Sequence, residues 1–365
     1  MLGSAGLVAV LAVAAVVAAL VRTGDVQPEL VTTSEPTLVF AEFGPSADEI
    51  FVAPASDPTA RTRIQSVPHA SGWGLNPAPE MVAGKTAYTV LPPNAAPERT
   101  SAAELWLLDV NTASASRLAR DADLLAAPVL RQDGDVLVYR RTEEDGAQSL
   151  VRVDLTTRAR RVLHREAQSF GLFPVGFDQS GAVLFTRLSA AGTDLVRVSE
   201  GSAATVVLHA SDEIARDWSM SPAGDAVAFV APLLQAERIV HQAQVLTLGG
   251  RSGNSQALVT SVVGEQYSPT WRSDGALAIG REATADGAAP LVIGAAVSTT
   301  LAADPAGFDV PLGWSAAGDY LAVRHFSGFN SQQPGVETLV LIGLDASRAE
   351  IATETELIFL GWTGA

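Results

Sequence analysis

The sequence predicts an all-β protein folded as a β-propeller, and three repeated patterns predict it. One is a glycine turn followed by an apolar strand. Another is a short strand that opens with leucine and ends in a polar turn. The third is an alternating strand that closes each unit. All three recur at spacings between 43 and 51 residues. A fixed period of this length, built from strands and turns, is typical of the blades of a propeller.

The glycine turns are clearest in two copies, Ser268–Gly275 and Pro311–Gly318, each followed by an apolar run. Glycine supplies the positive φ that a tight hairpin turn needs, and Asp or Ser beside it can bond the local backbone. These residues are therefore predicted to shape turns rather than to catalyse a reaction. The six turn glycines are Gly84, Gly134, Gly181, Gly224, Gly275 and Gly318.

The other two patterns place two further strands in each unit. The opening strands are Leu105–Asp109, Leu150–Asp154 and Leu195–Ser199, and two of the closing strands contain Val162–His164 and Val207–His209. Their alternation of apolar and polar residues is that of half-buried strands. Each unit is thus predicted to hold four strands.

The two ends of the chain are predicted to share one blade. Leu357–Trp362 resembles an innermost strand, yet the chain stops soon after it, and residues 37–43, 49–53 and 61–67 offer the three missing strands. Pairing both ends in one blade removes open sheet edges. We therefore expect seven blades over residues 37–365, about 47 residues each, with six or eight blades as the alternatives.

These repeats resemble those of the TolB-like, WD-type propeller family, whose unit reads approximately P-x-W-S-P-D-G before an apolar strand. Trp271 with Asp274-Gly275 comes closest, whereas Trp314-Ser315 is followed by Ala316-Ala317 in place of Pro-Asp. The resemblance covers residues 37–365. It implies a fold and no particular chemistry, because the family includes partner-binding scaffolds, propeller lids on peptidases and a few lyases.

The N-terminus predicts a membrane anchor. Residues 2–21 carry no charged side chain, and as a helix they would span roughly 30 Å, the thickness of a bilayer core. No Ala-x-Ala run follows directly after this stretch, where a cleavage site would lie, and those near the N-terminus are inside it, so residues 1–22 are interpreted as a transmembrane helix or an uncleaved signal. Residues 23–36 form a polar linker with two prolines. The propeller is expected on the extracytoplasmic side, periplasmic or at the cell surface.

Composition excludes several classes of function. The net charge of −16 argues against a basic surface for nucleic acid, and the absence of cysteine excludes disulfides and thiolate-bound metals. The sequence contains no Gly-x-Ser-x-Gly motif. No catalytic residue, cofactor or metal site is predicted. His164 and His209 occupy equivalent outer-strand positions in adjacent units, so the histidines are not expected to converge on a metal.

The candidate ligand-binding residues are arginines that follow the turn glycines, together with one histidine. Three or four guanidinium groups around one mouth of the ring could hold a carboxylate or phosphate by forked hydrogen bonds. A one-residue shift at Arg281 would turn its side chain to the other face of its sheet. The alternative is that each arginine pairs with a carboxylate such as Glu143, Glu144, Asp145 or Glu282. The candidates are Arg140, Arg187, Arg281, Arg324 and His325.

The sequence leaves three functions open. The favoured one is a membrane-tethered module that binds a protein, a peptide or a cell-envelope glycan. Its binding surface is the loop face at the ends of the inner strands that follow the turn glycines. A propeller enzyme, either a lyase or a glycoside hydrolase, would need acidic or histidine residues that converge in the central funnel, for example His325 near two carboxylates. A structural subunit of a membrane complex would show an exposed apolar patch on the tether side.

Overall fold

A computed structural model describes residues 35–364, with gaps at 97, 99–100, 168–169, 236–237, 250–255, 258–263, 284–286, 295–299 and 352–354. The chain divides into two compact units, residues 1–31 and 32–365, and the described residues all belong to the second. The predicted anchor over residues 1–22 and the linker up to residue 34 lie outside the described residues. Within the described part of the chain, no helix is long and apolar enough to span a membrane.

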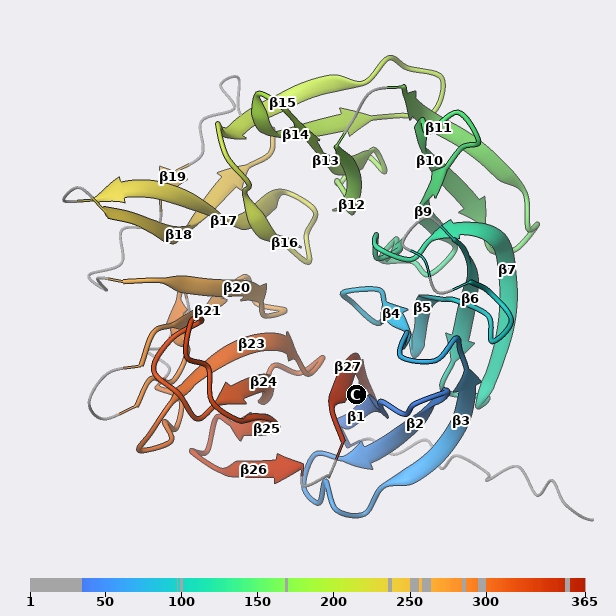
Figure 1. Cartoon of the computed structure of the whole chain (residues 1–365). Coiled ribbons are helices and arrows are strands. Elements are labelled where there is room, and N and C mark those ends of the chain that lie inside the picture. The colour runs from blue at the N-terminus through green and yellow to red at the C-terminus, as the bar shows by residue number, and fades with distance from the viewer. Residues whose placement is uncertain are drawn as a thin grey trace, which may run out of the picture. The chain divides into compact units, whose positions relative to one another are not determined.

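The described chain forms seven antiparallel sheets arranged as the blades of a propeller (Figure 1). From the innermost strand to the outermost, blade 1 contains β27 (Leu357–Thr363), β1 (Thr37–Glu42), β2 (Ala47–Pro54) and β3 (Thr62–Pro68). In the same order, blade 2 contains β4 (Asn76–Pro77), β5 (Lys85–Val90), β6 (Ala102–Asp109) and β7 (Ser114–Asp123). Blade 3 contains β8 (Val129–Leu130), β9 (Val136–Thr142), β10 (Gln148–Asp154) and β11 (Arg160–Glu166).

The remaining four blades follow in chain order, and their strands also run from the inside outward. Blade 4 contains β12 (Gly171–Phe177), β13 (Val183–Ser189), β14 (Gly192–Val198) and β15 (Thr205–Ser211). Blade 5 contains β16 (Arg216–Met220), β17 (Ala226–Gln235), β18 (Arg238–Thr247) and β19 (Gln256–Ala257). Blade 6 contains β20 (Gln266–Trp271), β21 (Leu277–Arg281) and β22 (Leu291–Ile293), and blade 7 contains β23 (Phe308–Trp314), β24 (Tyr320–Phe326), β25 (Glu337–Gly343) and β26 (Arg348–Ile351). Seven blades confirm the predicted architecture, and the predicted four strands are described in every blade except blade 6, where the described residues form three.

Blade 1 joins the two ends of the described chain. β27 pairs antiparallel with β1, so that Thr37 lies opposite Thr363 and Glu42 lies opposite Leu357. On its other side, β1 pairs with β2 over its whole length. The innermost strand of this blade therefore comes from the C-terminal end, and its other three strands come from the N-terminal end.

The turn glycines stand between the first and second strands of the other six blades. All six have positive φ values, from 69° at Gly224 to 85° at Gly275. At Gly224 a side chain would also lack space, because a Cβ atom there would lie 2.9 Å from the backbone nitrogen of Gln179 in the neighbouring blade. Glycine is thus needed for the conformation and for the close approach of two blades.

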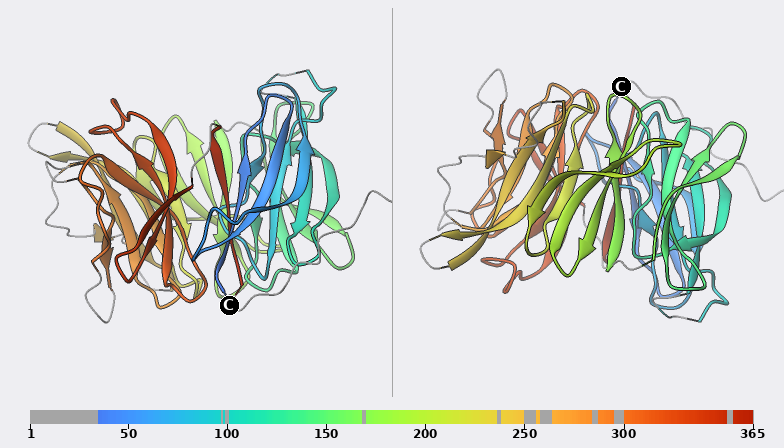
Figure 2. Two further views of the ribbon diagram at one scale, coloured as in Figure 1. Left: turned by 90° about the horizontal axis from the view of Figure 1, so that it is seen from below. Right: turned by 90° about the horizontal axis from the view of Figure 1, so that it is seen from above.

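The alternating strand directions give the ring two faces. Innermost strands end at the glycine turns, and we call that end the turn face. The opposite end, called the connection face, carries the loops between second and third strands and the loops from blade to blade. The C-terminal end of β27 lies at the turn face (Figure 2), and β1 begins beside it. The chain thus enters the propeller at the turn face.

The core lies between adjacent blades, where tryptophans of the innermost strands pack. Trp362 of β27 donates its indole N–H to the carbonyl of Gly313 in blade 7, at 2.9 Å. Trp271 of β20 donates in the same way to the carbonyl of Ser219 in blade 5, at 3.2 Å. Each bond joins two neighbouring innermost strands and satisfies a buried polar group.

Candidate functional site

Arg140 connects three blades. Its Nε and Nη2 atoms both lie 2.9 Å from Oδ2 of Asp123, at the end of blade 2. Its Nη1 donates to the carbonyl of Leu172 in blade 4 at 3.1 Å, and its guanidinium group stacks on Phe173 at 4.6 Å from the ring centre. The residue is only 4% exposed. Its hydrogen-bonding groups are therefore directed into the protein rather than toward a ligand.

The other three arginines also have partners in the protein. Arg187 donates to Asp194 at 2.6 Å, and Arg324 pairs with Glu337 at 2.9 Å. Arg281 donates to the carbonyl of Ala289 at 2.9 Å. All four arginines lie on second strands, six residues beyond their turn glycines, at the connection face. Their partners differ from the carboxylates that the sequence suggested. Each of the three guanidinium groups is hydrogen-bonded or paired to a protein group near it.

His325 belongs to a polar cluster in blade 7. Its Nδ1 lies 2.9 Å from Oδ1 of Asp309, which is 1% exposed. Both oxygens of Asp309 also accept from Arg348, at 2.8 Å each. His325 therefore contacts a single carboxylate, that of Asp309, and Arg348 binds the same carboxylate.

Each histidine of the chain lies beside a carboxylate. Among the described residues, no group of three histidines and carboxylates is placed to hold a metal ion. The pairs join His69 to Asp48, His164 to Glu166, His209 to Asp194, His241 to Glu265 and His325 to Asp309. At the surface pair, hydrogen bonds to Asp194 and Asp212 raise the pKa of His209.

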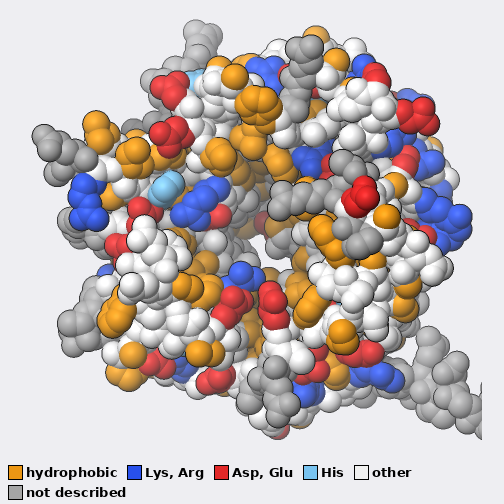
Figure 3. Space-filling view, in the orientation of Figure 1, with side chains coloured by type: hydrophobic (Ala, Val, Ile, Leu, Met, Phe, Trp, Pro, Cys, Tyr) orange, Lys and Arg blue, Asp and Glu red, His pale blue; other side chains and the backbone are white. Residues whose placement is uncertain are grey.

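The connection face carries most of the exposed apolar side chains. Of the large apolar side chains that are exposed in the described part of the chain, seven lie on its loops and hairpin tips. Two others lie on the outermost strands, and Leu344 lies at the turn face. Figure 3 views the connection face and shows orange side chains on its hairpins. The seven residues are Leu125, Phe170, Ile214, Leu234, Ile239, Phe329 and Val336.

Four of these side chains lie on two hairpins. In the β17–β18 hairpin, Leu234 pairs across the strands with Ile239, and the two residues are 77% and 55% exposed. In the loop 327–336, Phe329 is 73% exposed and Val336 is 68% exposed. Backbone hydrogen bonds close this loop, and the carbonyl of Phe329 accepts from Ala283 of blade 6 at 3.3 Å. The two hairpins belong to blades 5 and 7, with blade 6 between them, and we call these four residues together the hairpin patch.

A groove lies beside this patch, between blades 7 and 1. It encloses about 910 Å³ of empty space, part of it open to solvent, and its lining includes Arg324, Glu337 and Glu356. Burial raises the pKa of Glu337, the charge of Arg324 opposes that rise, and the nearby charge of Glu356 adds to it. Arg324 is the one predicted site residue in the groove.

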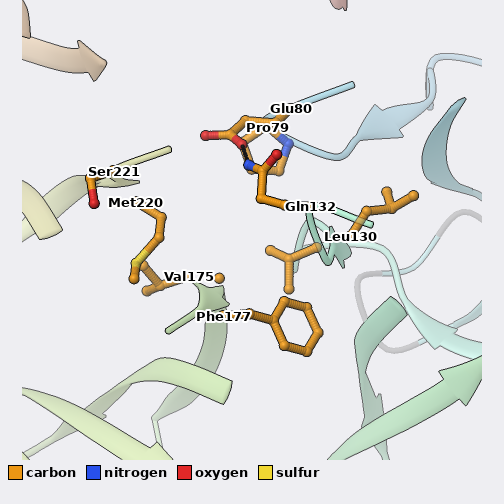
Figure 4. A pocket seen from close by; sticks show the side chains of 10 residues that line it. Pro79, Glu80, Leu130, Gln132, Val175, Phe177, Met220 and Ser221 are labelled. Atoms are coloured by element: carbon orange, nitrogen blue, oxygen red, sulfur yellow. Dashed lines mark hydrogen bonds between the residues drawn. The ribbon is translucent and has the colours of Figure 1, made fainter. Parts of the chain in front are cut away.

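The opposite face has a smaller pocket at the mouth of the central channel. It is formed by the ends of innermost strands from blades 2, 3, 4 and 5, and it encloses about 380 Å³ including the part open to solvent. Figure 4 shows Glu80 and Gln132 on one side of the opening, with Met220 and Ser221 across from them. None of the predicted site residues lies in this pocket, since the arginines are at the connection face. No sequence pattern marked Glu80.

Comparisons with known proteins identify the class of fold. No protein-family model and no curated protein match the sequence. Among solved structures, TolB from Acinetobacter baumannii aligns with a TM-score of 0.52 at 13% identity, over 92% of this chain and 68% of that one. The β-propeller domain of the Trilobed protease from Pyrococcus furiosus aligns with a TM-score of 0.55 at 10% identity, over 87% of this chain and 92% of that one.

An acylaminoacyl peptidase from Pyrococcus horikoshii aligns with a TM-score of 0.53 at 11% identity. The match covers 87% of this chain but only 50% of the peptidase, so this chain spans about half of its length. Identities this low show the fold alone. The protein is a seven-bladed β-propeller. Its structural neighbours include TolB propellers and the propellers of peptidases.

Proposed function

We propose that this protein is a membrane-tethered, extracytoplasmic propeller that binds a protein or peptide partner through its connection face. The observation that carries the proposal is the concentration of exposed apolar side chains on the loops of that face. Large apolar residues gathered on one surface of a soluble body mark interaction sites more often than scattered ones do. Aliphatic residues such as Leu234 and Ile239 favour a polypeptide partner over a glycan.

The direction of the tether supports the same proposal. The chain enters the propeller at the turn face, beside the end of β27. The hairpin patch lies on the opposite face, away from this point of entry. A structural subunit packed against the membrane would instead need its apolar patch on the tether side.

The fixed backbone conformation of the 327–336 loop favours binding as well. Phe329 is exposed on a loop that is closed by its own backbone hydrogen bonds, so little conformational entropy is lost when a partner covers it. Exposed aromatic side chains on rigid backbones often supply much of the affinity of an interface. We favour binding over catalysis because His325 and the four arginines already contact protein groups.

The proposal is tested with a photo-crosslinking amino acid placed in the full-length protein in its own membranes. Positions 329 and 234 probe the hairpin patch, and the matched controls are Leu344 at the turn face and Val162 on an outermost strand, which are also exposed. We expect a discrete adduct from both patch positions and from neither control. Adducts from the control positions only, or equal labelling at all four, contradict the proposal.

A further inference from the structure

The pocket at the turn-face mouth of the channel has apolar walls and one charged group. Leu130, Val175, Phe177 and Met220 supply the apolar side chains. Among its described lining residues, Glu80 is the only one that carries a charge. The space is narrow, so it favours an unbranched ligand over a ring or a branched group.

Two polar side chains of this pocket, Glu80 and Gln132, present hydrogen-bond acceptors. The Nε2 amide group of Gln132 donates to Oε2 of Glu80 at 3.0 Å, which leaves the Gln132 carbonyl oxygen as an acceptor. The hydroxyl of Ser221 donates to Asp225 at 2.8 Å and accepts from the backbone N–H groups of Asp225 and Ala226, so its hydrogen bonds are satisfied within the protein. The second carboxyl oxygen of Glu80 points into the opening (Figure 4). A ligand that matches these groups must therefore supply hydrogen-bond donors.

The electrostatics of Glu80 also call for a positive partner. The Glu80 side chain is exposed at the channel mouth, but the protein that surrounds the mouth partly desolvates it and raises its pKa to about 7, opposed only by the hydrogen bond from Gln132. No cation contributes to this balance. A cationic ligand would supply the counter-charge that the lining lacks, and it would favour the ionised form of this partly desolvated carboxyl group.

We propose that this pocket binds one primary alkylammonium group, with the ammonium on Glu80 and its aliphatic stem along the apolar walls. An ammonium group has three donors and no acceptor, which suits a carboxylate and an amide carbonyl together. It is also compact, whereas the planar fork of a guanidinium group is wider. Lysine-type stems bury their methylene groups on apolar surfaces in this way. This site is at the opposite face from the hairpin patch, and it does not depend on the proposed function.

The test uses the propeller at pH 8, where the Glu80 carboxyl group is ionised, with n-butylammonium as the probe. Butan-1-ol and butyrate serve as neutral and anionic probes of the same length. Saturation-transfer NMR should give a dissociation constant of about 1 mM for n-butylammonium, as expected for so small a ligand. Binding of the other two probes should be at least about tenfold weaker, because neither offers a charged donor.

Two variants at position 80 and one control variant decide whether Glu80 is responsible. Glu80→Gln keeps the size of the side chain, and it should weaken n-butylammonium binding by about tenfold or more. Glu144→Gln, which removes an exposed carboxylate at the connection face, should leave binding unchanged. Glu80→Asp keeps the charge but withdraws it by one methylene group, and it should give an intermediate loss. Equal binding to the protein and to folded Glu80→Gln, or equal binding of all three probes, overturns the proposal.

A blocked peptide, acetyl-Gly-Lys-Gly-amide, separates the two sources of such a ligand. Binding as strong as that of n-butylammonium, and equally sensitive to Glu80→Gln, assigns the pocket to a lysine side chain of a polypeptide. Binding of the free amine alone assigns it to a small amine. Crosslinking at the hairpin patch reports on the other face, so failure of this site leaves the proposed function standing, and the reverse also holds.

Discussion

Arg140 and Arg324 occupy equivalent positions in their blades but lie in different surroundings. Arg140 is buried against Asp123, whereas the Arg324 side chain is 41% exposed beside Glu337. Removing one partner of a buried ion pair leaves an unpaired charge, and this typically costs about 3–5 kcal/mol. Removing an exposed pair costs about 0–1 kcal/mol.

We therefore expect Arg140→Ala to lower the free energy of unfolding by about 3–5 kcal/mol and Arg324→Ala to change it by less than about 1 kcal/mol. Urea denaturation followed by tryptophan fluorescence measures both values. Equal, small losses for the two variants would mean that Arg140 does not hold the blades together.

Glu80 is expected to make stability depend on pH. The folded pKa of about 7 lies above the ordinary value of 4.5, so the folded state binds the proton more tightly than the unfolded state does. Stability then falls as the pH rises from about 4.5 to about 7, and the loss persists above that range. The full shift corresponds to roughly 3 kcal/mol, but water reaches this exposed side chain, so about 1 kcal/mol is expected.

Glu80→Gln removes this effect. At pH 8 the variant should unfold at a higher temperature than the parent protein, and at pH 4 the two midpoints should coincide. Thermal unfolding at a series of pH values makes the comparison, with Glu144→Gln as the control. A constant difference between variant and parent across the whole range contradicts the assigned pKa.

The sequence indicated where these side chains lie along the strands but not what they touch. Counting from the turn glycines placed Arg140 and Arg324 on second strands at the connection face, as the structure has them. The partner of Arg140, however, is Asp123 from the preceding blade, and its stacking partner is Phe173 from the following one. Contacts between blades depend on how the sheets pack, and a repeat pattern does not carry that information. Glu80 was missed for the same reason.

At the scale of the element, turns and strands were predictable because local chemistry determines them. A tight turn needs a residue that accepts positive φ, so the glycines marked the hairpins, and alternation of apolar and polar residues marked the strands after them. The projecting hairpin of β17 and β18 shows the limit. Its extent is set by pairing up to Gln235 and Arg238, far beyond the inner strand β16. The period of the repeat did not predict this projection or its exposed apolar pair, Leu234 and Ile239.

The closing strand is the element on which the ring depends. β27 covers the inner edge of β1, and Trp362 packs in the core between blades 7 and 1. A chain that ends at Glu356 should lose this strand and expose the edge of β1, which is then free to pair with another molecule. We expect this truncated protein to aggregate or to elute as oligomers in size-exclusion chromatography.

The control for that truncation ends at Thr363 and keeps all of β27. It should remain monomeric to the same degree as the full chain and unfold at a similar temperature. A monomeric, cooperatively folded protein without β27 would show that closure by this strand is dispensable.

At the scale of the whole molecule, the location of the propeller is the prediction to check first. Export follows from the apolar stretch over residues 2–21 and from the expectation that a large folded domain is translocated regardless of flanking charge. Protease added to cells with a permeabilised outer layer should then degrade the propeller, while a cytoplasmic marker survives. Full protection of the propeller in cells whose marker is also intact contradicts export.

The placement of β1 between β27 and β2 gives the molecule a mechanical property. A force applied to the N-terminal segment acts along β1 from the turn face. The hydrogen bonds to both neighbours run across the direction of that pull. β1 pairs with each neighbour through six residue pairs. The hydrogen bonds of these pairs would have to break at the same time before the strand came free, whereas those of a hairpin pulled apart from its open end break one after another. An anchor in the N-terminal segment would therefore pull at a point that resists tension, and the load of a bound partner would be borne without opening the ring.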